Sequence, residues 1–399
     1  MAQPGSPGSL RLLNADRILG VLLASGPGGR SRAEIARTTG LSKPTVSALV
    51  AELEDTGLTK PATAERAGPV GRPGTPYSVA PDAGFVLAAD IGASTITLGI
   101  ADLLGTIRAE REFATGPNAE VALAQVVSAA ADLQRELGCA VHHACAGVPG
   151  IYRQGDGVVG EALNLPGLNG MRVAGRLNEA FGVSVHVDND VNLAARGEAS
   201  ALADGECPHF VAISIGTGIG AGLVLNGELY RGSSDAAGEI GALAVPLGSS
   251  PGEAVRTLEE IASAPGIERT FREALADGVP SGLDPSSTVH EILAATQTGD
   301  RAAEQALDMA ADAMALAVAQ TSLLLNPDRI VFGGDTGANP VYVAAVGAAL
   351  GSYTSSSVNL VASTLGRRAT FVGAVMHAVD SLQRSIVRQR LGNGQPRTT

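Results

Sequence analysis

Apolar residues recur at helical spacing in short blocks between residues 14 and 56. The first block follows Asn14, a residue type that caps helices, and its apolar face carries Ile18, Leu19 and Leu22. The last block has apolar side chains at i, i+3, i+4 and i+7, namely Val46, Leu49, Val50 and Leu53. The pattern predicts three short helices with one buried face each. Residues 1–13 are rich in Gly, Pro and Ser, and we expect them to be disordered.

Capping residues and a glycine separate the second and third of these helices. Ser31 followed by Glu34 is a capping box that opens the second helix, and Gly40 permits a tight turn after it. Ser42 then caps the third helix, whose first turn tolerates Pro44. Two helices joined in this way are typical of a helix-turn-helix, although a three-helix bundle with no nucleic-acid role is the alternative. The side chains expected to contact DNA are Ser42, Lys43, Thr45 and Ser47.

The segment 57–80 is rich in Gly, Pro and Thr, and it predicts a wing followed by a linker. Residues 14–80 are therefore interpreted as a winged helix-turn-helix domain. Arg72, in the middle of Gly71-Arg72-Pro73, is placed to enter a narrow minor groove, where enhanced negative potential attracts arginine. A simple Pro/Gly hinge explains the same residues equally well.

From residue 85 onward, short apolar runs alternate with amphipathic blocks. Three strands are predicted first, at 85–91, 95–101 and 106–113. A second strand-rich start at 209–225 is followed by helices near 253–262, 266–276, 288–296 and 300–325. Two α/β lobes follow from this order. We expect lobe one at about 85–205 plus a C-terminal helix at 373–390, and lobe two at about 206–372.

Composition and charge fit a folded protein with a distinct N-terminal part. The chain is 45% hydrophobic and 17% charged, which excludes a disordered class. Its net charge of −12 is not that of a nucleic-acid binder as a whole. Residues 1–80, however, hold nine Lys/Arg and six Asp/Glu, while the rest of the chain has a net charge of −15. A small DNA-binding head on an acidic body has this asymmetry, and so does ordinary scatter.

The cysteines and the lengths of the apolar runs indicate the cellular compartment in which we expect the protein. Cys139, Cys145 and Cys207 are odd in number and form no CxC or CxxC pair, which argues against a disulfide framework and a thiolate metal site. The N-terminus lacks an apolar stretch of signal-peptide length, and no apolar run approaches the ~20 residues that span a bilayer. We expect a cytoplasmic protein with no membrane partner.

Three glycine-rich turns follow predicted strands: Asp90–Thr95, Gly216–Gly220 and Gly333-Gly334. Glycine lets backbone N–H groups converge on an anion such as phosphate without interference from a Cβ atom. Such turns are individually common, and their order along the chain is the more specific signal. The candidate phosphate-contacting residues are Asp90, Gly92, Gly216, Thr217, Gly218 and Gly220.

The segment Val187–Asn192 lies at a predicted strand-to-helix junction and carries Asp and Asn side chains. An aspartate here can accept a proton from a sugar hydroxyl while Asn189 holds a neighbouring hydroxyl, as phosphoryl transfer requires. Helix capping explains the same residues, and on this motif alone it is the preferred explanation.

Taken together, these segments resemble the ROK family of repressors and sugar kinases, which have the actin-like ATPase fold. The resemblance covers about residues 14–390. Its landmarks are Gly71-Arg72-Pro73, Asp90-Ile91-Gly92, Gly147-Val148-Pro149-Gly150, Asn164-Leu165-Pro166-Gly167, Asn189-Asp190-Val191-Asn192, Gly216–Gly222, Gly238-Glu239-Ile240-Gly241, Leu258-Glu259 and Ala262-Ser263.

The resemblance implies a site as well as a fold. It implies that residues 81–399 form a two-lobed sugar-kinase-like domain behind the winged head. In family kinases the position of Asp190 is the catalytic base, and the positions of Asn189, Glu239 and Glu259 hold sugar hydroxyls. We expect these four residues, with Asn164, to bind a sugar-like ligand.

Several departures from the family pattern argue against kinase chemistry. Ala242 stands where the family has His, and the segment 246–257 lacks the family's zinc-binding cysteines. A structural zinc site without ligands cannot exist, so we expect no metal. The first phosphate turn is Ala93-Ser94-Thr95 where the kinases have Gly-Thr-Lys, which removes the cationic donor and disfavours ATP binding. No cofactor is therefore expected.

The function expected from these features is a DNA-binding transcriptional regulator of carbohydrate-related genes, most simply a repressor. Its partners would be double-stranded operator DNA, a sugar-derived effector and a second copy of the chain in a homodimer or higher oligomer. Two alternatives remain: a sugar kinase that carries a DNA-binding head, for which Asp190 is the main support, and a ROK body that acts only as a ligand-free dimerisation scaffold.

Overall fold

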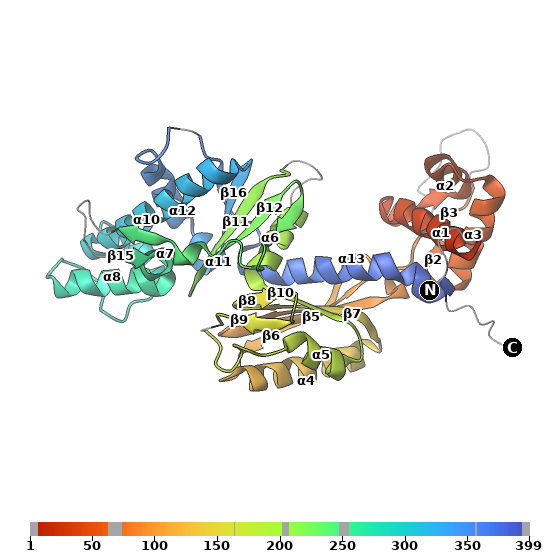
Figure 1. Cartoon of the computed structure of the whole chain (residues 1–399), viewed down its shortest axis with the longest axis horizontal. Helices are drawn as coiled ribbons and strands as arrows, with labels where there is room; N and C mark the ends of the chain where they lie inside the picture. The colour runs from red at the N-terminus through yellow and green to blue at the C-terminus, as the bar shows by residue number, and fades with distance from the viewer. Residues whose placement is uncertain are drawn as a thin grey trace.

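The computed structural model describes residues 7–62, 74–162, 164–201, 207–246, 255–355 and 357–392. Three bodies follow one another along the molecule: a small helical head, lobe one in the middle, and lobe two at the far end (Figure 1). The chain passes through them in this order and then returns, because its last helix lies on lobe one and extends to the head (Figure 1).

The head is a winged helix-turn-helix. Its helices are α1 (Pro7–Leu23), α2 (Arg32–Thr39) and α3 (Lys43–Asp55), with a 3-10 turn η1 (Gly26–Gly28) after α1. Its strands β1 (Arg30–Ser31), β2 (Thr59–Pro61) and β3 (Pro76–Val79) form a sheet in the order β1-β3-β2. The predicted capping box of Ser31 and Glu34 is confirmed, as are the cap at Ser42 and the left-handed Gly40 at the end of α2.

Helix α1 begins earlier than predicted, which corrects two expectations. It starts at Pro7, so Asn14 lies inside the helix and caps nothing, and residues 7–13 are helical rather than disordered. The reason is tertiary: Leu12 packs against the core of the head, and the guanidinium of Arg11 binds the carboxylate of Glu52 on α3. Residues 1–6 lie outside the described residues, and so does the segment 63–73 with Arg72.

Lobe one is built on a five-stranded mixed sheet with the order β10-β7-β4-β5-β6. The strands are β4 (Phe85–Ile91), β5 (Thr95–Asp102), β6 (Ile107–Ala114), β7 (Val141–Val148) and β10 (Val185–Asn189). Helices α4 (Ala119–Leu137) and α5 (Val173–Phe181) cover one face, and α6 (Asp190–Ala201) and α13 (Ala369–Gly392) cover the other (Figure 1). A short ribbon of β8 (Ile151–Arg153) and β9 (Val158–Gly160) leads toward lobe two.

Lobe two repeats this plan with the sheet order β13-β12-β11-β16-β17. The strands are β11 (Phe210–Ile215), β12 (Ile219–Leu225), β13 (Glu228–Tyr230), β16 (Arg329–Gly333) and β17 (Leu360–Ala362), and a hairpin of β14 (Ala244–Pro246) and β15 (Val255–Thr257) is added. Its helices are α7 (Leu258–Ala262), α8 (Ala264–Ala276), α9 (Val289–Thr296), α10 (Arg301–Leu325), α11 (Gly334–Gly337) and α12 (Pro340–Leu350). The helix predicted near 253–262 is wrong at its start, because residues 255–257 pair as a strand.

Helix α10 lies where the sequence predicted a helix, at 300–325. It is the one helix among the described residues that is long and apolar enough to cross a membrane by length and composition. More than half of its apolar window (56%) is buried, because α8, α9 and α12 pack around it in the core of lobe two. Its apolar character therefore reflects a core helix.

Two helices tie the bodies together. Helix α6 packs against β11 and β12 of lobe two as well as against α13, so it lies between the lobes. Helix α13 belongs to lobe one, as predicted, but begins at Ala369, four residues before the expected start. Linker residues 80–84, which include the 3-10 turn η2 (Pro81–Ala83), lead from β3 into β4. The apolar core of the head is continuous with residues on α13.

Candidate functional site

A cleft of about 600 Å³ lies between the two lobes and is lined by both. Lobe one contributes the ends of β4 and β10 and the start of α6. Lobe two contributes the turn between β11 and β12, the 3-10 turn η3 (Ile240–Ala242) and the start of α7. The five sequence-predicted ligand residues all line this cleft: Asn164, Asn189, Asp190, Glu239 and Glu259. Their role in binding stays a prediction.

Asp190 is the first residue of α6 and is half-buried in the lining of the cleft. Burial raises the pKa of Asp190 to about 6, against a hydrogen bond that its Oδ1 accepts from the backbone N–H of Val191 at 2.8 Å. Asp90, in β4, faces the same space, and burial together with the charge of Asp190 raises the pKa of Asp90 to about 8. A pair of carboxyl groups that resists ionisation therefore lies on the lobe-one side.

Asn189 performs the capping role that the motif suggested. Its Oδ1 accepts hydrogen bonds from the backbone N–H groups of Val191 (2.9 Å) and Asn192 (3.1 Å) at the start of α6. Its Nδ2 donates to the carbonyl of Gly150 at 2.9 Å. A bound hydroxyl would therefore have to share the Asn189 amide with these backbone partners.

On the lobe-two side, Glu259 is fixed by close backbone packing. Its Oε2 accepts a hydrogen bond from the backbone N–H of Ile219 at 2.9 Å. A Cβ atom on Gly218 or Gly241 would come within 2.9 Å and 3.2 Å of that same oxygen and would push the Glu259 side chain aside. At Gly241 it would also meet the backbone carbonyl of Ile219 at 2.4 Å. Asn164 lies in a lobe-one loop, and its Nδ2 would be 3.8 Å from the same Cβ atom added to Gly218. Glu259 and Asn164 therefore lie close together across the cleft.

Glu239 precedes the turn η3 and faces the other acids. Burial raises its pKa, and the charges of Glu161, Asp190 and Glu259 add to this effect. Glu161 was missed by the sequence reasoning, although it lines the cleft and has a left-handed backbone at φ 52°. A non-glycine residue in that conformation is uncommon, but no sequence signal marks it in advance.

The charge of the cleft is strongly one-sided. Its described lining has one basic side chain, Arg367, which is paired with Glu112 at 3.2 Å. The carboxylates in the same lining are Asp90, Glu161, Asp190, Glu198, Asp235, Glu239, Glu259 and Asp335. Such a surface accepts hydrogen bonds from hydroxyl or ammonium groups and repels phosphate.

The predicted phosphate turns also meet at this cleft. Asp90, Gly92, Gly216, Thr217, Gly218 and Gly220 line it, together with Gly333 and Gly334. Ala93 and Ser94 of the first turn line it too, where the family kinases have Gly and Thr before their Lys. The glycine turns predicted to contact phosphate are thus gathered at the cleft, and these turns carry no Lys or Arg side chain.

The chain does not fit the structural zinc of the family. The described residues contain no group of three or more His, Cys, Asp or Glu side chains that would hold a metal. Ala242 lines the cleft at the position of the family His, and residues 247–254 lie outside the described residues but include neither Cys nor His. No step can therefore be assigned to zinc.

The predicted DNA-contacting residues lie at the start of α3. Lys43 is exposed and Thr45 and Ser47 are half-exposed, so their side chains are accessible. Ser42 Oγ is occupied by the cap, at 3.2 Å from the Thr45 nitrogen and 2.7 Å from Thr45 Oγ1. Arg72 is outside the described residues, and its minor-groove role stays a prediction.

Known families account for both parts of this architecture. The pattern of the ROK family matches residues 86–380. The chain belongs to the ROK family. The pattern of the MarR family matches residues 17–65, which is the head. A MarR-type head on a ROK body makes this ROK protein a DNA-binding transcriptional regulator.

Individual relatives include both repressors and kinases. A putative xylose repressor of Caldicellulosiruptor sp. (strain Rt8B.4) is 30% identical over 76% of this chain and 78% of its own length. A glucokinase of Halalkalibacterium halodurans is 34% identical over 47% of this chain and 59% of its own. The repressor matches far more of this ROK protein than the kinase does.

Solved structures show the same fold. A ROK family transcriptional regulator, described as a homologue of the E. coli MLC protein, superposes with a TM-score of 0.77 and 22% identity over 96% of this chain and 100% of its own. A ROK family glucokinase from Streptomyces griseus superposes with a TM-score of 0.63 and 25% identity over 74% of this chain and 100% of its own. The regulator covers the head as well as the two lobes.

Proposed function

We propose that this ROK protein is a cytoplasmic repressor that binds operator DNA as a homodimer and changes its affinity when a sugar enters the interlobe cleft. The observation that carries the proposal is the union of a winged helix-turn-helix head with a cleft rich in hydroxyl acceptors and poor in cations. The second copy of the chain supplies the second recognition helix, since one helix reads few base pairs.

The effector we propose is an uncharged sugar. Glu239, Glu259 and Asp190 offer carboxylate oxygens from both lobes, and such acceptors suit a ring of hydroxyl groups. Glu239 and Glu259 are exposed and Asp190 is half-buried, so water can hydrate these groups without a ligand. What argues against a body that is only a scaffold is their convergence from both lobes in one cleft. The names of the similar xylose repressor and glucokinase make D-xylose and D-glucose the first ligands to test.

We further propose that the protein needs no cofactor and does not transfer phosphate. Phosphoryl transfer depends on neutralising the developing charge of the phosphates, and the described cleft offers one arginine, already paired, against eight acidic side chains. The second candidate is a sugar kinase with a DNA-binding head. It is favoured by Asp190, which lines the cleft and occupies the position of the family's catalytic base.

A thermal-shift experiment with D-xylose and D-glucose, each with and without ATP and Mg²⁺, tests the proposal. A sugar that binds the native state raises the unfolding temperature, and the proposal requires that ATP adds nothing to that shift. ADP release is followed in the same mixtures. Turnover at ordinary enzyme rates that is lost in Asp190→Asn would favour the kinase instead.

A further inference from the structure

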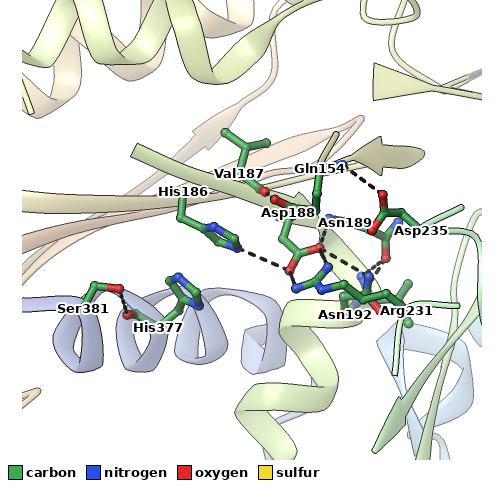
Figure 2. A network of polar contacts seen from close by, with 11 residues as sticks. Gln154, His186, Val187, Asp188, Asn189, Asn192, Arg231, Asp235, His377 and Ser381 are labelled. Atoms are coloured by element: carbon green, nitrogen blue, oxygen red, sulfur yellow. Dashed lines mark hydrogen bonds and ion pairs between the residues drawn. The ribbon is translucent and has the colours of Figure 1, made fainter. Parts of the chain in front are cut away.

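Two contacts near the cleft join lobe two to lobe one, and a third supports them within lobe one (Figure 2). Arg231, just after β13 of lobe two, forms a two-pronged ion pair with Asp188 at the end of β10 in lobe one. Asp235, in the same lobe-two loop, accepts a hydrogen bond from the backbone N–H of Gln154 at 3.0 Å. The Nε2 of Gln154 donates to the carbonyl of Val187, next to Asp188, at 3.3 Å.

Asp188 of this pair is buried, Arg231 is partly buried, and the carboxylate has several hydrogen-bond partners. Asp188 is 1% exposed, and it also accepts hydrogen bonds from Asn192 Nδ2 at 3.3 Å and from the backbone N–H of Asn189 at 2.8 Å. Burial alone would raise the pKa of Asp188, but hydrogen bonds and charge from Arg231 and His186 hold it at about 2. A buried carboxylate of this kind depends on its partner, because a single unpaired charge is costly inside a protein.

The same carboxylate connects the cleft to helix α13. Asn189 and Asp190 of the cleft follow Asp188 directly in sequence. On its other side, His186 Nε2 lies 3.5 Å from Asp188 Oδ2, and the His186 ring stacks on that of His377 with centroids 3.8 Å apart (Figure 2). His377 lies in the first half of α13, so the interlobe contact reaches this helix through one side chain.

Helix α13 runs from the cleft to the DNA-binding head. In its first turn, Thr370 Oγ1 donates to the backbone carbonyl of Asp190 at 3.1 Å. Near its end, Arg390 donates to the carbonyl of Ala83 in the linker at 2.7 Å. The last turns share one apolar core with helix α1 of the head, through Leu382, Ile386, Val387 and Leu391 on α13 and Ala15, Ile18, Leu19 and Leu22 on α1.

We infer that the Asp188–Arg231 pair and the His186–His377 stack form an interlobe relay that passes the state of the cleft to the DNA-binding head through α13. The inference rests on the proposed function and adds its route. A ligand that contacts both lobes changes the angle between them. The Asp188–Arg231 pair is one of the contacts through which this change in angle acts on lobe one. A helix of 24 residues spans about 36 Å and moves as a unit, so a small shift at His377 is carried to α1.

The test uses one double variant and one matched control. Asp188→Asn/Arg231→Gln removes both charges at nearly constant volume, which guards against misfolding caused by an unpaired Asp188. Arg256→Gln is the matched control, because Arg256 is also a partly buried lobe-two arginine but pairs with Glu273 within lobe two. Each full-length variant is measured by backbone hydrogen exchange and by binding to a duplex selected by the wild type from a random-sequence pool.

The hydrogen-exchange measurement, the exchange arm of the test, is made without sugar. We expect amides of residues 15–22 in α1 and of the last turns of α13 to exchange at least about fivefold faster in the double variant than in the wild type or Arg256→Gln, with α10 unchanged. Equal exchange at the head in all proteins would overturn the inference.

The binding arm uses D-xylose and D-glucose as probes. We expect wild type and Arg256→Gln to change duplex affinity about 5–150-fold with a sugar that binds, and the double variant to change it less than about twofold while still binding that sugar. An equal response in the double variant would refute the relay but leave the sensor intact. If neither sugar binds the wild type, that part of the proposed function fails, and the exchange arm alone decides the relay.

Discussion

At the residue scale, the cleft gathers acids that resist ionisation. Burial raises the pKa of Asp90 to about 8 and that of Asp190 to about 6, with the charge of Asp190 adding to the effect on Asp90. A carboxyl group whose pKa is raised on folding stabilises the native state fully below its unfolded pKa. That stability is lost as the pH rises through the folded pKa. The free energy of unfolding should therefore fall between about pH 4 and pH 8 on account of this pair.

Replacing one member of the pair tests this account. Asp90→Asn removes the group that resists ionisation, so we expect it to leave the unfolding temperature nearly unchanged at pH 4 and to raise it by several degrees at pH 9. About 2–4 °C is expected for each kcal/mol gained in a domain of 150–250 residues, and less in a longer chain such as this one. Calorimetry across pH measures the shift, with the exposed Asp82→Asn as control. A variant that is equally stabilised at both pH values would refute the burial argument.

A second residue-scale prediction concerns Glu239, which faces Glu161, Asp190 and Glu259 in the cleft. Hydrogen bonds to charged groups contribute about 1.5–3 kcal/mol, so Glu239→Ala should weaken sugar binding by about 10–150-fold. Duplex affinity without sugar should not change, because Glu239 precedes η3 in lobe two, and lobe two lies at the opposite end of the molecule from the head (Figure 1). Calorimetric titration gives the sugar affinity. A variant that binds sugar like the wild type would remove Glu239 from the site.

At the element scale, the sequence anticipated elements that carry strong local signals. The bounds of β4 and the caps of α2 and α3 follow from apolar runs and from Ser, Glu and Gly at the required positions. Strands of three residues, such as β8, β14 and β15, are too short to show a period. The start of α1 depends on contacts with α3 and the core, which no local pattern contains.

The residues of the candidate site also fall into those that the sequence could predict and those that it could not. The glycine turns and the acids at 190, 239 and 259 carry family motifs, so they were found from sequence. Glu161 and the Asp188–Arg231 pair belong to no such motif. Glu161 stands out by its left-handed backbone, and Asp188 and Arg231 by a contact between residues 43 positions apart in the sequence. Such features depend on tertiary structure and cannot be seen along the chain.

The recognition helix α3 offers a direct test of DNA contact. Lys43→Ala removes an exposed cation at the start of the helix, so binding to the selected duplex should weaken. The slope of log affinity against log salt should fall by about 1 if Lys43 neutralises one phosphate. Arg135→Ala, an exposed charge on lobe one, is the control. An unchanged slope for Lys43→Ala would remove this residue from the interface.

The packing of α13 on α6 predicts contrasting effects of two glycine substitutions. A Cβ atom on Gly373 would lie 1.8 Å from the carbonyl of Leu193, whereas one on Gly347 in α12 would meet nothing within 4 Å. Gly373→Ala should lower the free energy of unfolding by about 1–3 kcal/mol or more, because the helices must separate. Gly347→Ala should raise it by up to about 1 kcal/mol through helix propensity. Urea unfolding measures both, and equal effects would contradict the close approach.

At the scale of the whole molecule, two connections join the cleft to the head. One is the linker at residues 80–84, which leads directly into β4. The other is α13, which contacts Asp190 of the cleft at its start and Ala83 of the linker near its end. In a dimer that reads two half-sites, the spacing of the heads must match the helical repeat of DNA. Small rotations of the lobes are then sufficient to change operator affinity.

The most direct test of a sugar-responsive regulator is the affinity of the wild-type protein for its selected duplex, measured across D-xylose and D-glucose concentrations at fixed salt. We predict a shift of about 5–150-fold that saturates with the occupancy of the cleft, and an equal shift in sugar affinity when the duplex is present, as linkage requires. A sugar that occupies the cleft while duplex affinity stays constant would contradict the account.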